Sequence, residues 1–338
     1  MKIFVKITAL LIATSMLLCS CGGNNSSDNG EITVTDQAGR TVSLDSEAER
    51  IVSSYYISTA LFIALGCEDE LVGIEKKADT RELYKLAAPK IIDLPAIGSG
   101  KEINVEATAA LDPDVVVIPL RLLDYVEAFE ELDIPVVVVN PETQEDFEEC
   151  LSILAKITGE TERGEKLLSY YSDKMAEMSS LTKDLEKPSV YLAGSSAVTR
   201  TVTSDMYQSD LIEMAGGVNV SDDLTGGEWA DITAEQLLVY DPEYIFAVSY
   251  ADYTVGDIAA DEAYSDLDAV KNVRLYTFPS DIEAWDYPTP SSVLGVMWLT
   301  HILHPDVYSE EEYLTEARDF YKTYFDIEVT ESNLGIDK

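Results

Sequence analysis

Four short segments of the chain are almost continuously apolar, and between them apolar residues recur at helical spacing. The apolar segments are Val115–Ile118, Val136–Val139, Val190–Ala193 and Ile245–Val248. Parallel strands covered by helices on both faces have this composition, because neither face of the sheet meets water. The pattern therefore predicts an α/β fold, with two such strands in each half of the chain.

A long helical stretch separates the two halves. No strand pattern occurs between residues 143 and 187, and apolar residues recur there at intervals of three or four: Phe147, Leu151, Leu154, Leu167, Tyr171, Met175, Met178, Leu181 and Leu185. Residues 160–186 predict a helix roughly 40 Å long, at about 1.5 Å per residue, which ends before Pro188. We therefore expect an N-terminal α/β lobe over residues 31–158, a linking helix over 159–187 and a C-terminal α/β lobe over 188–338.

The two lobes repeat each other at an offset of 129 residues. Residues 98–118 align without a gap to residues 227–247, with Gly, Ile, Glu and Asp-Pro at matching places. Each copy predicts a short helix capped near Asn104 or Thr233, a stop at Asp-Pro, and a buried strand. An internal repeat indicates two related folding units. Each half is therefore predicted to be a doubly wound α/β lobe, with a ligand cleft between the lobes.

The N-terminus has the features of a secretory signal. Lys2 and Lys6 precede an apolar run from Ile7 to Leu18, which is too short for a permanent membrane span. The sequence Leu-Cys-Ser-Cys that ends at Cys21 resembles a bacterial lipobox, which implies lipidation of that cysteine. Residues 21–30 are rich in Gly, Asn and Ser, as flexible tethers are. We expect a signal peptide over residues 1–20, a tether over 21–30 and anchoring at the outer face of the cytoplasmic membrane, extracellular in a Gram-positive cell and periplasmic otherwise.

Composition excludes several functions. The chain carries 63 Asp and Glu against 23 Lys and Arg, a net charge of −40, so its surface repels nucleic acid phosphates. Two histidines and four cysteines leave little material for a zinc cluster, and we assign His301 and His304 a packing or capping role. Whether Cys67 and Cys150 pair is left open. No nucleophile elbow, P-loop, dinucleotide fingerprint or zinc-protease motif occurs, although a surface-tethered hydrolase using Ser195 or a carboxylate pair stays an alternative.

Most candidate ligand-binding residues follow the predicted strands, since ligands of open α/β sheets bind beyond the carboxyl ends of the strands. The internal repeat adds Trp229, in the turn that begins at Gly227. Aromatic side chains offer large stacking faces, and arginine grips anionic groups with a planar fork. The candidates are six aromatic residues, Tyr55, Tyr56, Trp229, Tyr250, Trp285 and Tyr287, and two arginines, Arg121 and Arg200.

Several segments together resemble the substrate-binding lipoproteins of ABC importers for ferric siderophores, haem and cobalamin. They are the lipobox, residues 32–44, the Asp112-Pro113-Asp114 segment, and residues 285–299, which begin Trp-Asp-Tyr-Pro-Thr-Pro. The resemblance covers essentially the whole mature chain. It implies two α/β lobes bridged by one long helix, a monomer without a covalent cofactor or bare metal ion, and delivery of a bulky chelate to an ABC permease and its ATPase.

The resemblance also implies roles for single residues. Members that handle anionic ferric siderophores use cleft arginines and aromatic residues, and the candidates above occupy the expected positions. Permease docking uses one acidic residue on each lobe, for which Glu102 and Glu213 are the counterparts, although this chain has Val218 where many relatives carry Glu. A haem binder would add an axial ligand, for which Tyr207, Met206 or Tyr287 are available. We expect a ferric siderophore as ligand, with cobalamin or haem as the alternatives.

Overall fold

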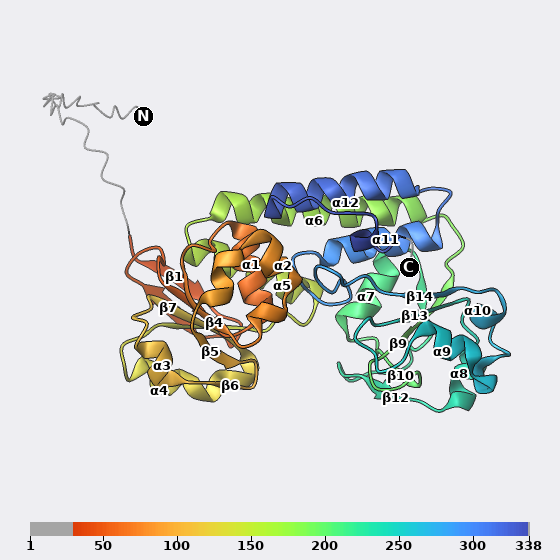
Figure 1. Cartoon of the computed structure of the whole chain (residues 1–338), viewed down its shortest axis with the longest axis horizontal. Helices are drawn as coiled ribbons and strands as arrows, with labels where there is room; N and C mark the ends of the chain where they lie inside the picture. Colours follow the sequence, from red (N-terminus) through yellow and green to blue (C-terminus); the bar gives the residue numbers. More distant parts are fainter. Residues whose placement is uncertain (1–29, 337–338) are drawn as a thin grey trace, which may run out of the picture.

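The computed structural model describes residues 30–336 and consists of two α/β lobes joined along one side by long helices (Figure 1). The predicted signal peptide, the lipidation site Cys21 and the predicted tether up to residue 29 lie outside the described residues. Among the residues that are described, no helix is long and apolar enough to cross a membrane.

The N-terminal lobe is built on a sheet with the strand order β6-β5-β4-β3-β7-β8, in which β6 is antiparallel and the other strands are parallel. Its strands are β3 (Ile51–Ser53), β4 (Leu71–Glu75), β5 (Ala96–Ser99), β6 (Glu102–Ile103), β7 (Val115–Pro119) and β8 (Val136–Val139). Its helices are α1 (Tyr56–Leu65), α2 (Glu82–Ala87), α3 (Val105–Ala109), α4 (Val126–Glu130) and α5 (Gln144–Ile157), and the hairpin β1 (Ile32–Thr35) and β2 (Thr41–Leu44) packs on α5. Strands β7 and β8 are buried along their whole length, as their apolar sequences predicted.

The C-terminal lobe has the strand order β12-β10-β9-β13-β14, with β11 beside β9. Its strands are β9 (Ser189–Ala193), β10 (Arg200–Thr201), β11 (Val218–Asn219), β12 (Ala230–Asp231), β13 (Tyr244–Ala247) and β14 (Leu275–Thr277). Its helices are α7 (Tyr207–Met214), α8 (Ala234–Tyr240), α9 (Val255–Ala260), α10 (Asp268–Lys271) and α11 (Ser292–Leu303). Strands β11, β9, β13 and β14 run parallel to one another, so the predicted pair of doubly wound lobes is confirmed.

The internal repeat is confirmed in structural detail. Helix α3 begins after Asn104, whose side chain accepts the Ala107 backbone N–H, and helix α8 begins after Thr233, whose side chain accepts the Gln236 backbone N–H. Asp112 and its repeat partner Asp241 both adopt left-handed backbone angles, with φ of 52° and 41°. Asp241 is the C-cap of α8, whereas α3 ends at Ala109, before Asp112, and in both copies proline and then the buried strand β7 or β13 follow the aspartate.

The linking helix α6 (Thr161–Thr182) is shorter than predicted, because residues 183–187 leave the helix before Pro188. It packs on α5 of the N-terminal lobe and on α11 of the C-terminal lobe. The buried Tyr171 hydroxyl donates to the Thr289 carbonyl at 3.0 Å, which ties the middle of α6 to the loop before α11. Helix α6 therefore supports both lobes at once.

Helix α12 (Glu310–Phe325) packs on α11 of the C-terminal lobe but not on that lobe alone. It lies alongside α6 (Figure 1) and also contacts α1 of the N-terminal lobe. Lys174 Nζ lies 2.6 Å from Glu316 Oε1, and the rings of Tyr170 and Phe320 are 5.4 Å apart. These contacts tie α12 to the linking helix as well as to α1.

Arg163 joins three of these helices, and we predict that its replacement by alanine destabilises the fold by about 2 kcal/mol, the scale of hydrogen bonds from a charged donor. Its Nε donates to the Ala64 carbonyl in α1 at 2.6 Å, and its Nη2 donates to the Tyr324 carbonyl in α12 at 2.9 Å. Urea unfolding of residues 21–338 measures the change. Arg318→Ala is the control, since Arg318 makes an exposed ion pair with Glu331 and should change stability by less than about 0.5 kcal/mol. Equal effects of the two substitutions would contradict the prediction.

Candidate functional site

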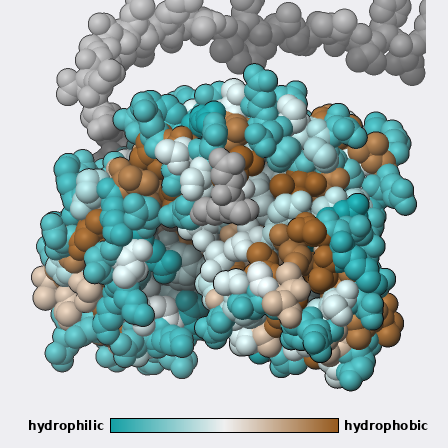
Figure 2. Space-filling model, turned by 45° about the vertical axis from the view of Figure 1, so that its right-hand side comes forward, coloured by the Kyte–Doolittle hydropathy of each residue, from teal (hydrophilic) through white to brown (hydrophobic). Residues whose placement is uncertain are grey.

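The cleft between the lobes contains two compartments. One, of about 390 Å³, is lined by residues that include Tyr55, Arg121, Arg200 and Trp229, and we call it the Trp229 compartment. The other, of about 310 Å³, is lined by residues that include Arg81, Tyr84, Tyr250 and Glu283, and we call it the Arg81 compartment. Tyr56 and Tyr287 line both. Figure 2 shows the surface hollowed between its two halves, with hydrophilic residues over most of the surrounding face.

Three tyrosine rings separate the two compartments. Tyr56, at the start of α1, meets Tyr287 of the opposite lobe edge-on, with ring centroids 6.5 Å apart. Tyr250 stacks on the other side of Tyr287 at 5.1 Å, and its hydroxyl donates to Asp286 Oδ2 at 2.8 Å. The partition between the compartments is therefore itself a contact between the lobes.

Arg121 and Arg200 reach the Trp229 compartment from opposite lobes. The Arg121 guanidinium lies over the Tyr55 ring, 4.9 Å from its centroid, and its Nε donates to the Gly100 carbonyl. Arg200 Nη1 lies 3.7 Å from Asp231 Oδ1 in the neighbouring strand. Both arginines are held by the protein but keep part of their surface open to the cleft, so they could contact an anionic ligand.

Trp229 stands on a loop that two glycines shape. Gly226 and Gly227 adopt φ of 130° and 66°, angles that other residues rarely take. The indole lies against the backbone of Gly194, so closely that a Cβ added there would come within 2.7 Å of the ring. The glycine at position 194 therefore allows the half-buried Trp229 ring to lie flat at the cleft wall.

The Trp229 compartment is not uniformly positive. Glu142, Asp205 and Glu228 also line it, and all three are exposed. Asp205 Oδ2 accepts the Gly226 backbone N–H at 2.8 Å, which helps to hold the Trp229 loop. These carboxylates, which the sequence patterns did not reveal, would disfavour a ligand of high negative charge.

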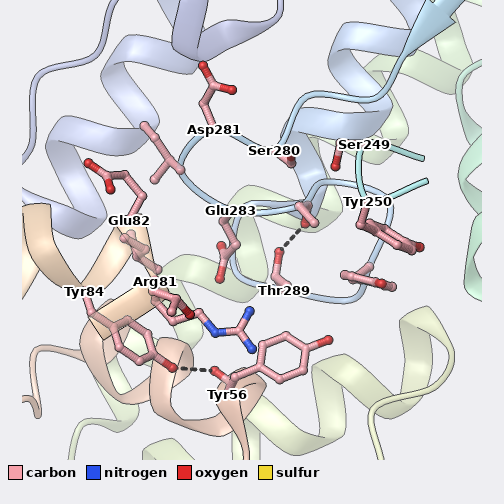
Figure 3. A pocket seen from close by; sticks show the side chains of 15 residues that line it. Tyr56, Arg81, Glu82, Tyr84, Ser249, Tyr250, Ser280, Asp281, Glu283 and Thr289 are labelled. Atoms are coloured by element: carbon pink, nitrogen blue, oxygen red, sulfur yellow. Dashed lines mark hydrogen bonds between the residues drawn. The ribbon is translucent and has the colours of Figure 1, made fainter. Parts of the chain in front are cut away.

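The Arg81 compartment brings a guanidinium and a carboxyl group together from the two lobes (Figure 3). Arg81, directly before α2, lies over the Tyr56 ring with its guanidinium 4.4 Å from the centroid. Glu283 is half-buried and accepts the Ser291 backbone N–H at 3.1 Å. Burial raises the pKa of Glu283 to about 7, and it raises the pKa of Asp286 to about 6.

A buried carboxyl group supports this wall of the cleft. Glu75, at the end of β4, accepts the Thr59 hydroxyl of α1 at 2.8 Å and the Tyr84 hydroxyl of α2 at 2.8 Å. The Tyr84 hydroxyl also lies 3.2 Å from the Tyr56 carbonyl oxygen. Burial raises the pKa of Glu75. This network connects α1 to α2 and so fixes Tyr56 relative to Arg81.

Seven of the eight predicted ligand-binding residues line the cleft, and Trp285 does not. Tyr55, Tyr56, Arg121, Arg200, Trp229 and Tyr287 line the Trp229 compartment, and Tyr250 lines the Arg81 compartment. Trp285 is 1% exposed, and its Nε1 donates to the Tyr321 hydroxyl of α12 at 3.1 Å. Its placement in the cleft was therefore wrong: the segment does reach the cleft, but this side chain turns into the core beneath α12.

Arg81 and Glu283 were missed by the sequence interpretation. Arg81 follows β4, a strand that charged residues flank on both sides, so its apolar run is too short to stand out. Arg121 was selected because ligands bind beyond the carboxyl ends of strands. If β4 had been recognised as a strand, the same rule would have selected the residues after it. Glu283 follows β14 and was passed over in favour of its neighbours Trp285 and Tyr287.

The residues predicted for permease docking, for haem ligation and for packing lie in different parts of the structure. Glu102 is exposed and lies 2.6 Å from Lys76 Nζ, which lowers the pKa of Glu102, and Glu213 is exposed on α7. Met206 and Tyr207 line the Trp229 compartment, and Tyr207 is buried. His301 Nδ1 and His304 Nε2 lie 3.1 Å from the Tyr308 and Gly216 carbonyls, respectively.

Metal and thiol chemistry have little support within residues 30–336. Across that range no group of three or more His, Cys, Asp and Glu side chains could hold a metal ion. Cys67 and Cys150 are buried free thiols, and burial raises the pKa of both, that of Cys67 to about 12.

Comparisons with known proteins cover both lobes. Residues 51–282, more than half of the chain, match the family described as periplasmic binding protein. A periplasmic solute-binding protein from Veillonella parvula has a similar fold, with a TM-score of 0.79 and 26% identity over 90% of this chain and 96% of that one. The molybdate-binding protein MolA of Haemophilus influenzae is 22% identical over 95% of this chain and 97% of its own length. The petrobactin-binding protein YclQ of Bacillus subtilis is 23% identical over 81% of this chain and 88% of its own length.

We predict that Trp229 accounts for most of the tryptophan emission that acrylamide can quench. The chain has three tryptophans, and Trp285 and Trp298 are each 1% exposed, whereas Trp229 is half-buried at the cleft wall. Trp229→Phe should therefore remove most of the quenchable emission, and the control Trp285→Phe should leave it. Quenching that survives Trp229→Phe would show that the indole is shielded from solvent.

We further predict that Glu283→Gln stabilises the protein more at pH 8 than at pH 5. The Glu283 pKa of about 7 in the folded state exceeds the value of about 4.3 for an unfolded chain. The folded state therefore keeps a proton that the unfolded state has lost, and the stability that Glu283 contributes declines as the pH rises toward and through 7. Glutamine does not titrate. Thermal unfolding of both proteins from pH 5 to pH 8 measures the difference, and a constant difference across this range would contradict the prediction.

Proposed function

The chain belongs to the periplasmic binding protein family, and on this premise we propose that it captures a ferric siderophore in the inter-lobe cleft. As a member of this family it is a substrate-binding protein of an ABC importer and not an enzyme. It acts outside the cytoplasm. The proposal concerns the identity of the ligand, the residues that hold it and the anchoring of the protein.

One observation carries the choice of ligand: two arginines from opposite lobes and an indole line the same compartment. Arg121 and Arg200 could hydrogen-bond the anionic oxygen atoms of a chelate, while Trp229 and Tyr55 could stack on its organic surface. A volume of about 390 Å³ suits a small organic ligand or part of a larger one. Because the two arginines come from different lobes, a ligand that contacts both would hold the lobes together.

The charged side chains of the Trp229 compartment limit the net charge of the chelate that it can bind. The three carboxylates Glu142, Asp205 and Glu228 share the compartment with the two arginines. A chelate with several negative charges would meet these carboxylates as well as the arginines, so we propose a ferric complex of low negative charge. The printed name of YclQ, a petrobactin-binding protein, supports an iron chelate as the class.

A bare oxyanion is the second candidate that the relatives suggest, since MolA is named for molybdate. A small oxyanion has no apolar surface to pack against the rings of Tyr55 and Trp229, which line the Trp229 compartment. This aromatic wall is our reason for preferring an organic chelate.

The location and the partner belong to the same proposal. We place the protein on the outer face of the cytoplasmic membrane, anchored by a lipid on Cys21, and we propose that Glu102 and Glu213 contact the permease. The exposure of both carboxylates supports this role. Mass spectrometry of the membrane-extracted protein would detect the lipid on Cys21.

We predict that Arg121→Ala and Arg200→Ala each weaken binding of an anionic ferric chelate at least tenfold, or about 1.4 kcal/mol, and cobalamin less than twofold. Each substitution removes a charged hydrogen-bond donor. Cobalamin depends less on such a donor, because cobalamin carries fewer anionic groups than these chelates. Residues 21–338 are titrated with ferric citrate, a ferric hydroxamate, a ferric catecholate and cobalamin, using calorimetry or tryptophan quenching corrected for ligand absorption.

Arg318→Ala is the matched control, since it removes an arginine that lies on α12 and pairs with Glu331. It should change none of these affinities. If both cleft variants bind the tightest ferric chelate with unchanged affinity, the proposed arginine contacts are refuted. If only cobalamin binds saturably, the ligand is cobalamin and not a ferric siderophore, and the importer role stands.

A further inference from the structure

The Arg81 compartment has no role in the siderophore contacts proposed above, yet it is a formed cavity of about 310 Å³ in the same cleft. The tyrosine pair Tyr56 and Tyr287 separates it from the Trp229 compartment. Arg81 enters it from the N-terminal lobe and Glu283 from the C-terminal lobe. The residues of the Arg81 compartment can therefore bind a chemical group other than the one held in the Trp229 compartment.

The Arg81 side chain is held by an aromatic ring and by no polar group within residues 30–336. Its guanidinium makes a cation–π contact with Tyr56, and the structure gives it neither a hydrogen bond nor an ion pair within that range. The other two cleft arginines differ, since Arg121 donates to the Gly100 carbonyl and Arg200 lies near Asp231. A guanidinium fixed over a ring with its N–H groups unused suits a planar carboxylate.

Glu283 is the opposite charge in this compartment. Figure 3 shows its carboxyl group directed toward Arg81 across the cavity. The two groups do not approach within the 4.0 Å of an ion pair, so a gap remains between them. A simple anion on Arg81 would face the Glu283 carboxylate, and a simple cation on Glu283 would face Arg81. When Glu283 is ionised, a group that carries both charges satisfies both residues.

We propose that the Arg81 compartment binds an α-amino acid group, with its carboxylate on Arg81 and its ammonium on Glu283. The rings of Tyr250 and Tyr287 would face the side chain, and the Ser249 and Ser280 hydroxyls could supply further hydrogen bonds. This assignment rests on the proposed use of the inter-lobe cleft for ligand binding. The group comes either from a free amino acid or from a chelate whose iron centre occupies the Trp229 compartment.

The pH dependence separates this ligand from an oxyanion. An ammonium group needs the ionised form of Glu283, so the amino acid should bind more weakly as the pH falls from 8 to 6, whereas an oxyanion should bind more tightly. The titratable groups that line the compartment or lie near Glu283 are Tyr56, Arg81, Glu82, Tyr84, Tyr250, Asp281, Asp286 and Tyr287, with Tyr171 of α6 and Tyr321 of α12. Burial raises the pKa of both Tyr171 and Tyr321, so these two stay neutral, and Asp286 titrates near Glu283. Glu283→Gln therefore has to be compared with the unchanged protein.

The test titrates residues 21–338 calorimetrically with L-phenylalanine, N-acetyl-L-phenylalanine and L-phenylalanine methyl ester. The first carries both charges, the second lacks the ammonium and the third lacks the carboxylate. We expect one-to-one binding of L-phenylalanine and at least tenfold weaker binding of both derivatives. This comparison uses the unchanged protein, so it does not depend on the folding of any variant. Equal binding of either derivative would overturn the proposal.

Variants then identify the residues. Arg81→Ala should weaken L-phenylalanine at least tenfold, and Glu283→Gln should do the same and remove the pH dependence. Arg274→Ala is the matched control, because Arg274 also lies over a tyrosine, 5.0 Å from the Tyr244 ring centroid, but does not line the cleft. It should leave binding unchanged.

A second arm distinguishes the source of the amino acid group. It compares the ferric tris complex of Nδ-acetyl-Nδ-hydroxy-L-ornithine, whose α-amino acid groups remain free, with ferric tris-acetohydroxamate, which has none. If the group belongs to a chelate, the first complex should bind at least tenfold more tightly than the second, and Arg81→Ala should remove this advantage. If neither L-phenylalanine nor the ornithine complex responds to Arg81→Ala, the proposal fails. Failure of the siderophore function is read separately, from the response of both ferric complexes to Arg121→Ala and Arg200→Ala.

Discussion

The packing of α6 against α11 and α12 sets the distance between the lobes, and every contact across the cleft depends on that distance. Tyr171 ties α6 to the loop before α11, while Arg163 ties α6 to α1 and α12. Side chains from the two lobes share a compartment because this layer of helices holds the lobes side by side. The Tyr56 and Tyr287 rings, which meet edge-on, show how closely the lobes approach at the partition.

The sequence predicted the lobes well because their determinants are local. Strands β7 and β8 are runs of apolar residues, and the repeat places Asn104 and Thr233 at the same point of equivalent helices. The packing of helix α12 was harder to predict, because its apolar face could pack on either lobe. Only the tertiary structure shows that α12 covers α6. Period and capping identify a helix but do not name the surface on which it packs.

The cleft residues illustrate the same limit at the scale of single side chains. The rule that ligands bind beyond the carboxyl ends of strands found the segment that carries Arg121, and the internal repeat found the loop that carries Trp229, because both depend on topology alone. The rule could not tell which side chains of an irregular loop face the ligand, so Trp285 was assigned to the cleft although it is buried against Tyr321. Arg81 was missed for a different reason: the short strand β4 before it lies among charged residues and gives no clear apolar pattern.

The net charge of −40 gives the cleft arginines their importance. At physiological ionic strength charges are screened over about 8 Å, so a negatively charged ligand is repelled mainly when it comes close to the acidic surface. Positive charge is then needed at the point of contact, where Arg81, Arg121 and Arg200 stand. Carboxylates accompany the arginines in both compartments, so the cleft presents a pattern of both charges and not simply a positive surface. Such a pattern discriminates between ligands of similar size, which is the task of a protein that captures one solute from a mixture.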